Sequence, residues 1–170
     1  LLSDIGRVDL HRLSGLTGLK TLGLSRNWMQ ETLDGVEALT GLTTLSVSIC
    51  ENLTDISALA GHPGLTRLSL FRCLTLPGLT GLSDLPSLAH LNLSQCKALT
   101  TLDGLASAPA LAELDLSYCR MLVDASALSG LTGLRELKMT DCRSLPCLPP
   151  LGALPKLAEL DLHGNRALKD

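Results

Sequence analysis

The side chains best suited to act as a base and its partner carboxylate are those of His90 and Glu113. They are 23 residues apart, which is the period of the repeat described below, so they should lie on neighbouring strands and could form a hydrogen bond. Ser69 or Ser94 would lie nearby as a hydroxyl nucleophile. Catalysis also needs a pocket, and we expect an open, solvated face without one. Since the sequence holds no glycine-rich phosphate loop or other catalytic motif, we predict that the protein is not an enzyme.

The histidines and cysteines do not form a metal-binding pattern, and no cofactor is expected. The four histidines occupy different places of the repeat, and no Cys-x-x-Cys pair occurs. Five cysteines share one place, where stacked strands at roughly 4.8 Å would bring them within disulfide distance. Parallel thiols in one core would have to turn toward each other, so we predict buried, reduced thiols, with disulfide or metal bonding as the alternative. The five are Cys50, Cys73, Cys96, Cys119 and Cys142, and Cys147 stands apart.

A 23-residue repeat positions these side chains, and its seven copies run without insertion or deletion. The unit is clearest in LAHLNLSQC, from Leu88 to Cys96, with leucine at the first, fourth and sixth places and cysteine at the ninth. Self-similarity at a period of roughly 20 to 50 residues indicates a solenoid. The first place is occupied by Leu19, Leu42, Leu65, Leu88, Leu111, Leu134 and Leu157.

The segments LKTLGLSRN, LAELDLSYC and LAELDLHGN resemble the LxxLxLxxN/C core of the leucine-rich-repeat superfamily. The resemblance covers nearly all of the chain. The 23-residue form with cysteine is similar to repeats of plant intracellular receptors, plant-pathogen effectors and kinetoplastid proteins. It implies an α/β fold: a curved, right-handed solenoid with a parallel sheet on its concave face and mostly coil or 3₁₀ turns on its convex face.

We expect a single domain over residues 1–170. It comprises a partial repeat over 1–18, full repeats that begin at 19, 42, 65, 88, 111 and 134, and a partial repeat over 157–170. The repeat pattern is already present at Leu10 and Leu13, which precede Leu33 and Val36 by 23 residues. Because we find no polar cap at the start and the last repeat stops halfway at Asp170, we expect a segment of a larger protein.

Each repeat returns through a segment with apolar residues at its twelfth, fifteenth and eighteenth places. These segments are rich in proline and glycine, which argues against long helices, and LPCLPPLGALP should be nearly all coil. The first full repeat has Gln30 where later repeats have leucine. We expect Met29 or Trp28 to fill that gap, and the alternative is that Trp28 is exposed for docking.

The side chains between the strand leucines should face the concave surface, because side chains alternate along a strand. Over the first three full repeats these places carry four positive charges and no negative one. The fourth repeat is neutral, and the last three carry six acids against two bases. Such segregation favours an oppositely polarised partner, although charges that only interact with solvent are the alternative.

One apolar group interrupts this polar surface: Ile49, Phe71 and Tyr118, with Arg72 and Gln95 in the same columns. Exposed aromatic and arginine side chains are frequent anchors of interfaces, so we expect them to contribute to partner binding. The alternative is that they are isolated surface residues. The predicted partner-binding residues are Ile49, Arg67, Phe71, Arg72, His90, Asn92, Gln95, Glu113, Asp115, Tyr118, Glu136 and Lys138.

The net charge of −3 and the lack of a long apolar run give no reason to expect nucleic acid or a membrane as partner. A basic stripe at the tenth place could contact phosphate, but pairing with neighbouring acids is the simpler explanation. The stripe consists of Lys97, Arg120, Arg143 and Arg166.

We therefore predict a protein–protein interaction module, monomeric and part of a larger cytoplasmic protein, since unpaired thiols favour a reducing compartment. One alternative is the substrate-recognition segment of a secreted effector enzyme, such as a ubiquitin ligase, that acts in a host cytoplasm. The other is a structural or assembly repeat.

Overall fold

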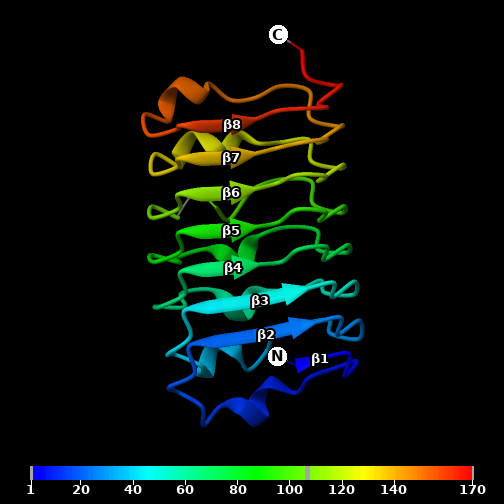
Figure 1. The fold of residues 1–170 in the computed structure, drawn as a ribbon, viewed down its shortest axis with the longest axis vertical. Helices are drawn as coiled ribbons and strands as arrows, with labels where there is room; N and C mark the ends of the chain where they lie inside the picture. The colour runs from blue at the N-terminus through cyan, green and yellow to red at the C-terminus, as the bar shows by residue number, and fades with distance from the viewer. Residues whose placement is uncertain (1, 106–107, 170) are drawn as a thin grey trace.

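The computed structural model describes residues 2–105 and 108–169, which form one stack of repeats around a parallel sheet (Figure 1). The eight strands follow one another in chain order from β1 to β8. They are β1 (Leu2–Ser3), β2 (Thr21–Ser25), β3 (Thr44–Ser48), β4 (Arg67–Ser69), β5 (His90–Asn92), β6 (Glu113–Asp115), β7 (Glu136–Lys138) and β8 (Glu159–Asp161). The predicted solenoid is therefore confirmed, while Asp170 lies outside the described residues.

The register between strands is constant from β2 to β8. Leu45 lies beside Leu68, and Leu68 beside Leu91, so partners are always one repeat apart. Each place of the repeat consequently forms a column across the sheet. The first strand is an addition that the sequence did not predict, and it pairs Leu2 with Leu24, one residue out of the 23-residue period.

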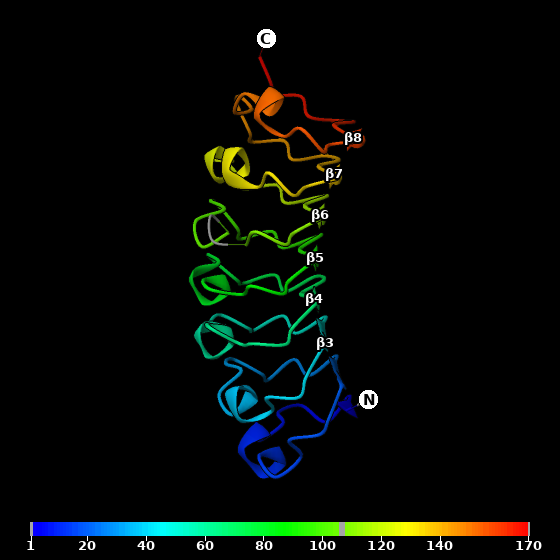
Figure 2. The same ribbon diagram turned by 90° about the vertical axis from the view of Figure 1, so that its left-hand side faces the viewer.

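The chain returns on the opposite side of the stack through short 3₁₀ helices, while the strands line the concave side (Figure 2). The helices are η1 (Leu10–Leu13), η2 (Val36–Ala38), η3 (Ser57–Leu59), η4 (Thr80–Leu82), η5 (Ser126–Gly130) and η6 (Leu151–Ala153). The proline-rich segment is coil apart from η6, as predicted. Over residues 2–105 and 108–169, no helix has the length and apolar character needed to cross a bilayer.

The leucine columns form one continuous core between the strands and the returning segments. Leu91 and Leu93 are 2% and 0% exposed, and such burial contributes roughly 1.5 to 3 kcal/mol per side chain as an upper estimate. Neighbouring repeats supply both walls of this core. Leu160, in the same column as Leu91, is 44% exposed because β8 pairs on one side only.

The cysteine column is buried and free of disulfides, as predicted, while Cys147 is exposed. Each buried thiol donates to the carbonyl oxygen of the sixth-place residue in the preceding repeat. The Sγ–O distances are 3.3 Å from Cys73 to Val47, 3.2 Å from Cys96 to Leu70, 3.2 Å from Cys119 to Leu93 and 3.1 Å from Cys142 to Leu116. The thiol is thus both a small core side chain and the donor that satisfies a buried carbonyl.

Asparagine takes over this bond in the repeats where it replaces cysteine. Asn165 donates from Nδ2 to the Met139 oxygen at 2.8 Å and accepts from the Cys142 N–H at 2.8 Å. Asn27 does the same with the Leu2 oxygen at 2.9 Å and the Ile5 N–H at 3.2 Å. The ninth place therefore joins each turn to the repeat before it.

The first full repeat differs from our expectation. Trp28 and Met29 are 57% and 50% exposed, so neither fills the place left by the missing leucine. Gln30 itself is buried there, accepting from the Val8 N–H at 2.8 Å and donating to the Thr32 oxygen at 2.8 Å. A buried amide is tolerated because both of its ends are hydrogen-bonded.

The buried thiols should react far more slowly than Cys147. Burial raises the pKa of Cys142 to about 11 and that of Cys96 to about 12, so almost no thiolate exists at pH 8. A thiol reagent should therefore modify one cysteine quickly in the folded protein and all six in denaturant, as counted by mass spectrometry. Modification of the five buried thiols at the rate of Cys147 would contradict this.

Replacement of His62 by leucine should stabilise the fold. His62 is buried in a column that holds Leu39 and Leu85 in the adjacent repeats, and its Nδ1 has no hydrogen-bond partner among the residues that the structure describes. Its Nε2 lies 3.1 Å from the Leu39 oxygen, which already accepts from the Leu42 N–H at 2.8 Å. We expect His62→Leu to raise the free energy of unfolding by about 1 kcal/mol in urea titrations. A lower free energy would show that the imidazole bond outweighs the orphaned nitrogen.

Candidate functional site

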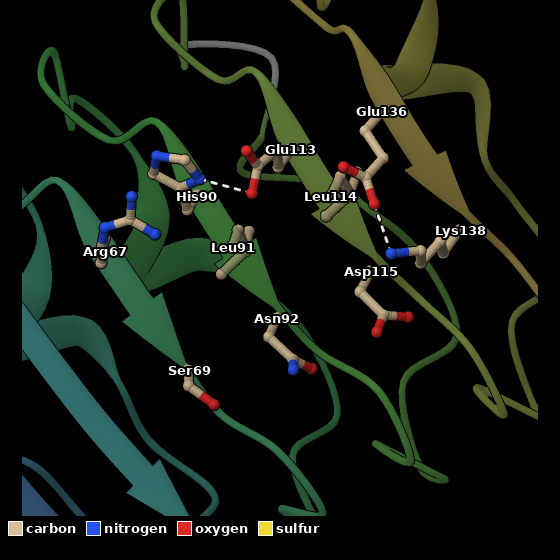
Figure 3. A pocket seen from close by; sticks show the side chains of 10 residues that line it. All are labelled: Arg67, Ser69, His90, Leu91, Asn92, Glu113, Leu114, Asp115, Glu136 and Lys138. Carbon is tan, nitrogen blue, oxygen red and sulfur yellow. Dashed lines mark ion pairs between the residues drawn. The ribbon is translucent and has the colours of Figure 1, made fainter. Parts of the chain in front are cut away.

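A depression of about 310 Å³ lies on the concave face across β4 to β7 (Figure 3). The expectation of a face without a pocket was therefore wrong. Long side chains at the third and fifth places stand around shorter ones such as Ser69 and Asn92, which leaves space above the sheet. Its lining comprises Arg67, Ser69, His90, Leu91, Asn92, Glu113, Leu114, Asp115, Glu136 and Lys138.

The third-place column forms one row of the depression: Arg67, His90, Glu113 and Glu136, each beside the next in the sheet register. The Nδ1 atom of His90 lies 2.6 Å from Oε2 of Glu113, so the two side chains meet as their spacing predicts. The pair does not have hydrogen-bond geometry, and the predicted hydrogen bond is therefore not seen in the described residues. Within the part of the chain that the structure describes, Arg67 has no carboxylate within ion-pair distance. A basic and an acidic group thus stand at opposite ends of this row.

These residues do not form a complete catalytic chain of nucleophile, base and orienting group. The hydroxyl of Ser94 is buried and donates to Oδ1 of Asn92 at 2.6 Å. Among residues 2–105 and 108–169, no hydrogen bond joins a serine to His90. No group of three or more metal-ligating side chains occurs in those residues either. The arrangement offers charged contacts to a bound molecule.

The fifth-place column forms the second row, and its asparagine and aspartate members have a structural role that the sequence analysis missed. Oδ1 of Asn92 accepts from the Ser94 N–H at 2.8 Å, and Oδ1 of Asp115 accepts from the Ser117 N–H at 2.9 Å. Such bonds hold the turn that follows each strand. Asparagine or aspartate two residues before a serine was the available signal.

Lys138 breaks this pattern, because its ammonium group cannot accept a hydrogen bond. It pairs instead with Glu136 on the same strand (Figure 3). The pKa of Lys138 is raised, chiefly by the hydrogen bond to Glu136, with smaller contributions from the charges of Asp115 and Glu159. The wall of the depression opposite Arg67 is therefore predominantly acidic.

The other five predicted site residues lie beyond the strand ends and do not line the depression. The middle strands end at Ser69, Asn92 and Asp115, before the seventh and eighth places are reached. The eighth-place residues are in the left-handed region, with φ of 60° at Ile49, 58° at Arg72, 64° at Gln95 and 63° at Tyr118. Side-chain alternation along a strand therefore does not apply to them.

Ile49 and Phe71 are neighbours, since the Ile49 N–H donates to the Phe71 oxygen at 2.9 Å. Tyr118 belongs to the same edge but is separated from them by the repeat that contains Gln95. The apolar group that the sequence predicted is consequently divided into two parts. Phe71 is half-buried, whereas Tyr118 is 38% exposed.

No protein-family model matches this sequence, and the search of curated proteins gave no match. Similar solved structures include an internalin, InlF, of Listeria monocytogenes, at 20% identity and a TM-score of 0.62 over 94% of this chain and 60% of that one. Internalin C2 of the same organism has 24% identity and a TM-score of 0.59, over 82% and 69%. The leucine-rich repeat domain of the type III effector XopL has 22% identity and a TM-score of 0.59, over 99% and 70%.

The chain spans 60% of the length of the InlF structure, so similarity to it concerns part of that protein only. At identities of 20% to 24%, these comparisons establish a common fold. They agree with the repeat register in the sheet and with the short 3₁₀ returns.

The two rows of the depression should respond differently to truncation. Asp115→Ala removes the acceptor of the Ser117 N–H and should lower the free energy of unfolding by about 1 kcal/mol. Glu113→Ala on the same strand is the matched control, because Glu113 is exposed and contacts a side chain, His90. It should change stability by less than about 0.5 kcal/mol in the same urea titration. Equal effects would refute a turn-holding role for Asp115.

Proposed function

We propose that this chain, which has the leucine-rich-repeat fold, is a protein-interaction module that binds a partner protein on its concave face. The observation that carries the proposal is the depression across β4 to β7, where side chains of both charges converge on a rigid sheet. A preorganised surface loses little conformational entropy when it binds, which favours its use as a platform.

The arrangement of charge supports a protein partner. Arg67 and Glu113 are two strand spacings apart, or roughly 10 Å, which suits an acidic and a basic side chain on one partner surface. Charges arranged in this way orient the partner and accelerate association. The depression is open and charged, whereas sites for small molecules are mostly apolar and bury their ligand.

The twelve residues named from the sequence remain the proposed contact set, in two groups. Seven line the depression: Arg67, His90, Asn92, Glu113, Asp115, Glu136 and Lys138. Five follow the strand ends at its margin: Ile49, Phe71, Arg72, Gln95 and Tyr118. In this proposal the depression supplies orientation and the margin supplies apolar anchors. The free thiols fit a reducing compartment, so we extend the proposal to an intracellular protein.

Charge reversal at the depression tests the proposal directly. Arg67→Glu combined with Glu113→Lys leaves the net charge unchanged and inverts the pattern that the partner would meet. The matched control is Glu31→Lys with Lys156→Glu, at two exposed residues away from the depression. Affinity purification from the source cells should recover a partner with the wild type and the control and lose it with the inverted variant. Equal recovery with all three proteins would refute binding at the depression.

Once the captured partner is purified, substitutions at the apolar margin and at the charged face should affect different rate constants of binding. Phe71→Ala should weaken binding by roughly 1 to 3 kcal/mol, mainly through faster dissociation. Glu159→Lys, on β8 at the acidic end, should mainly change the association rate and its salt dependence. Biolayer interferometry at two salt concentrations measures both, with circular dichroism as the folding control. Unchanged affinity of the folded Phe71→Ala variant would remove Phe71 from the interface.

A further inference from the structure

Three arginines gather outside the depression, on the turns that follow β6, β7 and β8. Arg120, Arg143 and Arg166 occupy the tenth place of consecutive repeats and are exposed, and Lys97 occupies the same place one repeat earlier. Asp141 lies among them. Arg143 donates from Nε to Oδ1 of Asp141 at 3.2 Å and from Nη2 to Oδ2 at 3.0 Å. We call these three arginines, with Lys97, the arginine edge.

Asp141 is held firmly in this position. Its backbone is left-handed, with φ of 57°, and its N–H donates to the His163 oxygen at 2.8 Å. A Cβ on Gly164 would lie 2.5 Å from Oδ1 of Asp141, so only glycine lets the carboxylate lie against that turn. The pKa of Asp141 is lowered, first by its bond to Arg143 and further by the charges of Arg120 and Arg166. All three guanidinium groups therefore act on one carboxylate.

The positive charge of the arginine edge exceeds what Asp141 neutralises. Among residues 2–105 and 108–169, neither Arg120 nor Arg166 has a carboxylate within ion-pair distance. Within the described part of the chain, the expectation that the basic stripe pairs with neighbouring acids holds for Arg143 alone. Met121, adjacent to Arg120, is 55% exposed and adds an apolar contact to the same turn.

We infer that the arginine edge is a second docking surface, and that its occupant is an extended acidic segment of a partner protein. Carboxylates of the segment pair with Arg120 and Arg166, and an apolar side chain packs on Met121. The Arg143–Asp141 pair shows that guanidinium groups on this edge bind carboxylates through two nitrogens. The surface is separate from the depression and adds to the proposed function.

Charge favours a protein segment over nucleic acid as the occupant. The arginine edge borders the acidic end of the concave face, where Glu136 and Glu159 lie beside each other on β7 and β8. A continuous polyanion would be repelled there, and the chain carries a net charge of −3. A segment with two or three carboxylates needs only the edge itself.

The probe for this site is a fluorescein-labelled peptide of about seven residues that carries three glutamates among alanines and one central phenylalanine. Fluorescence anisotropy at about 50 mM salt limits screening. Arg120→Glu combined with Arg166→Glu should weaken binding at least about tenfold. The control Arg7→Glu with Lys156→Glu changes the net charge equally at exposed residues elsewhere and should stay within about twofold.

Arg120→Gln with Arg166→Gln should give an intermediate loss, and circular dichroism checks that each variant is folded. Arg67→Glu should leave peptide binding intact, which separates this site from the depression. The inference is overturned if the wild type does not bind the glutamate peptide, or if the control variant loses as much binding as Arg120→Glu with Arg166→Glu. It is equally overturned if single-stranded DNA of matched charge binds more tightly than the peptide.

Discussion

Each strand from β2 to β7 is hydrogen-bonded to the strand one repeat later, and this bonding continues past the strand ends. The Arg72 N–H donates to the Ser94 oxygen at 2.9 Å, and the Gln95 N–H to the Ser117 oxygen at 2.8 Å. The ninth-place thiols then donate back to the preceding repeat. Every column of side chains depends on this register. A single inserted residue would shift the columns and turn core leucines toward solvent.

Because the register is constant, sequence spacing predicts which side chains meet across the sheet. The buried thiol column follows from the ninth place, and the contact of His90 with Glu113 follows from their spacing of one repeat. The leucine core is predictable for the same reason, since a parallel sheet aligns equal places. These features need only the period and the alternation of side chains along a strand.

Other features depend on details that the period does not contain. The depression arises from side-chain length and rotamer, and the turn-holding role of Asp115 depends on where β6 ends. The left-handed eighth place takes Ile49 and Tyr118 out of the side-chain alternation of the strands, and no simple residue preference predicts it, because isoleucine occupies that place at residue 49. The burial of Gln30 is likewise not predictable from the period, since it depends on hydrogen bonds to Val8 and Thr32 in two separate segments.

Site-specific photocrosslinking tests the central claim that the partner binds the concave face. A photoreactive amino acid at position 69 would project from the depression, and the same amino acid at position 80 would project from η4 on the convex side of the same repeat. Among residues 2–105 and 108–169, neither native side chain donates or accepts a bond that holds the backbone, so both variants should fold. The concave-face account predicts crosslinks to the partner from position 69 only. Crosslinks from position 80, with none from position 69, would contradict it.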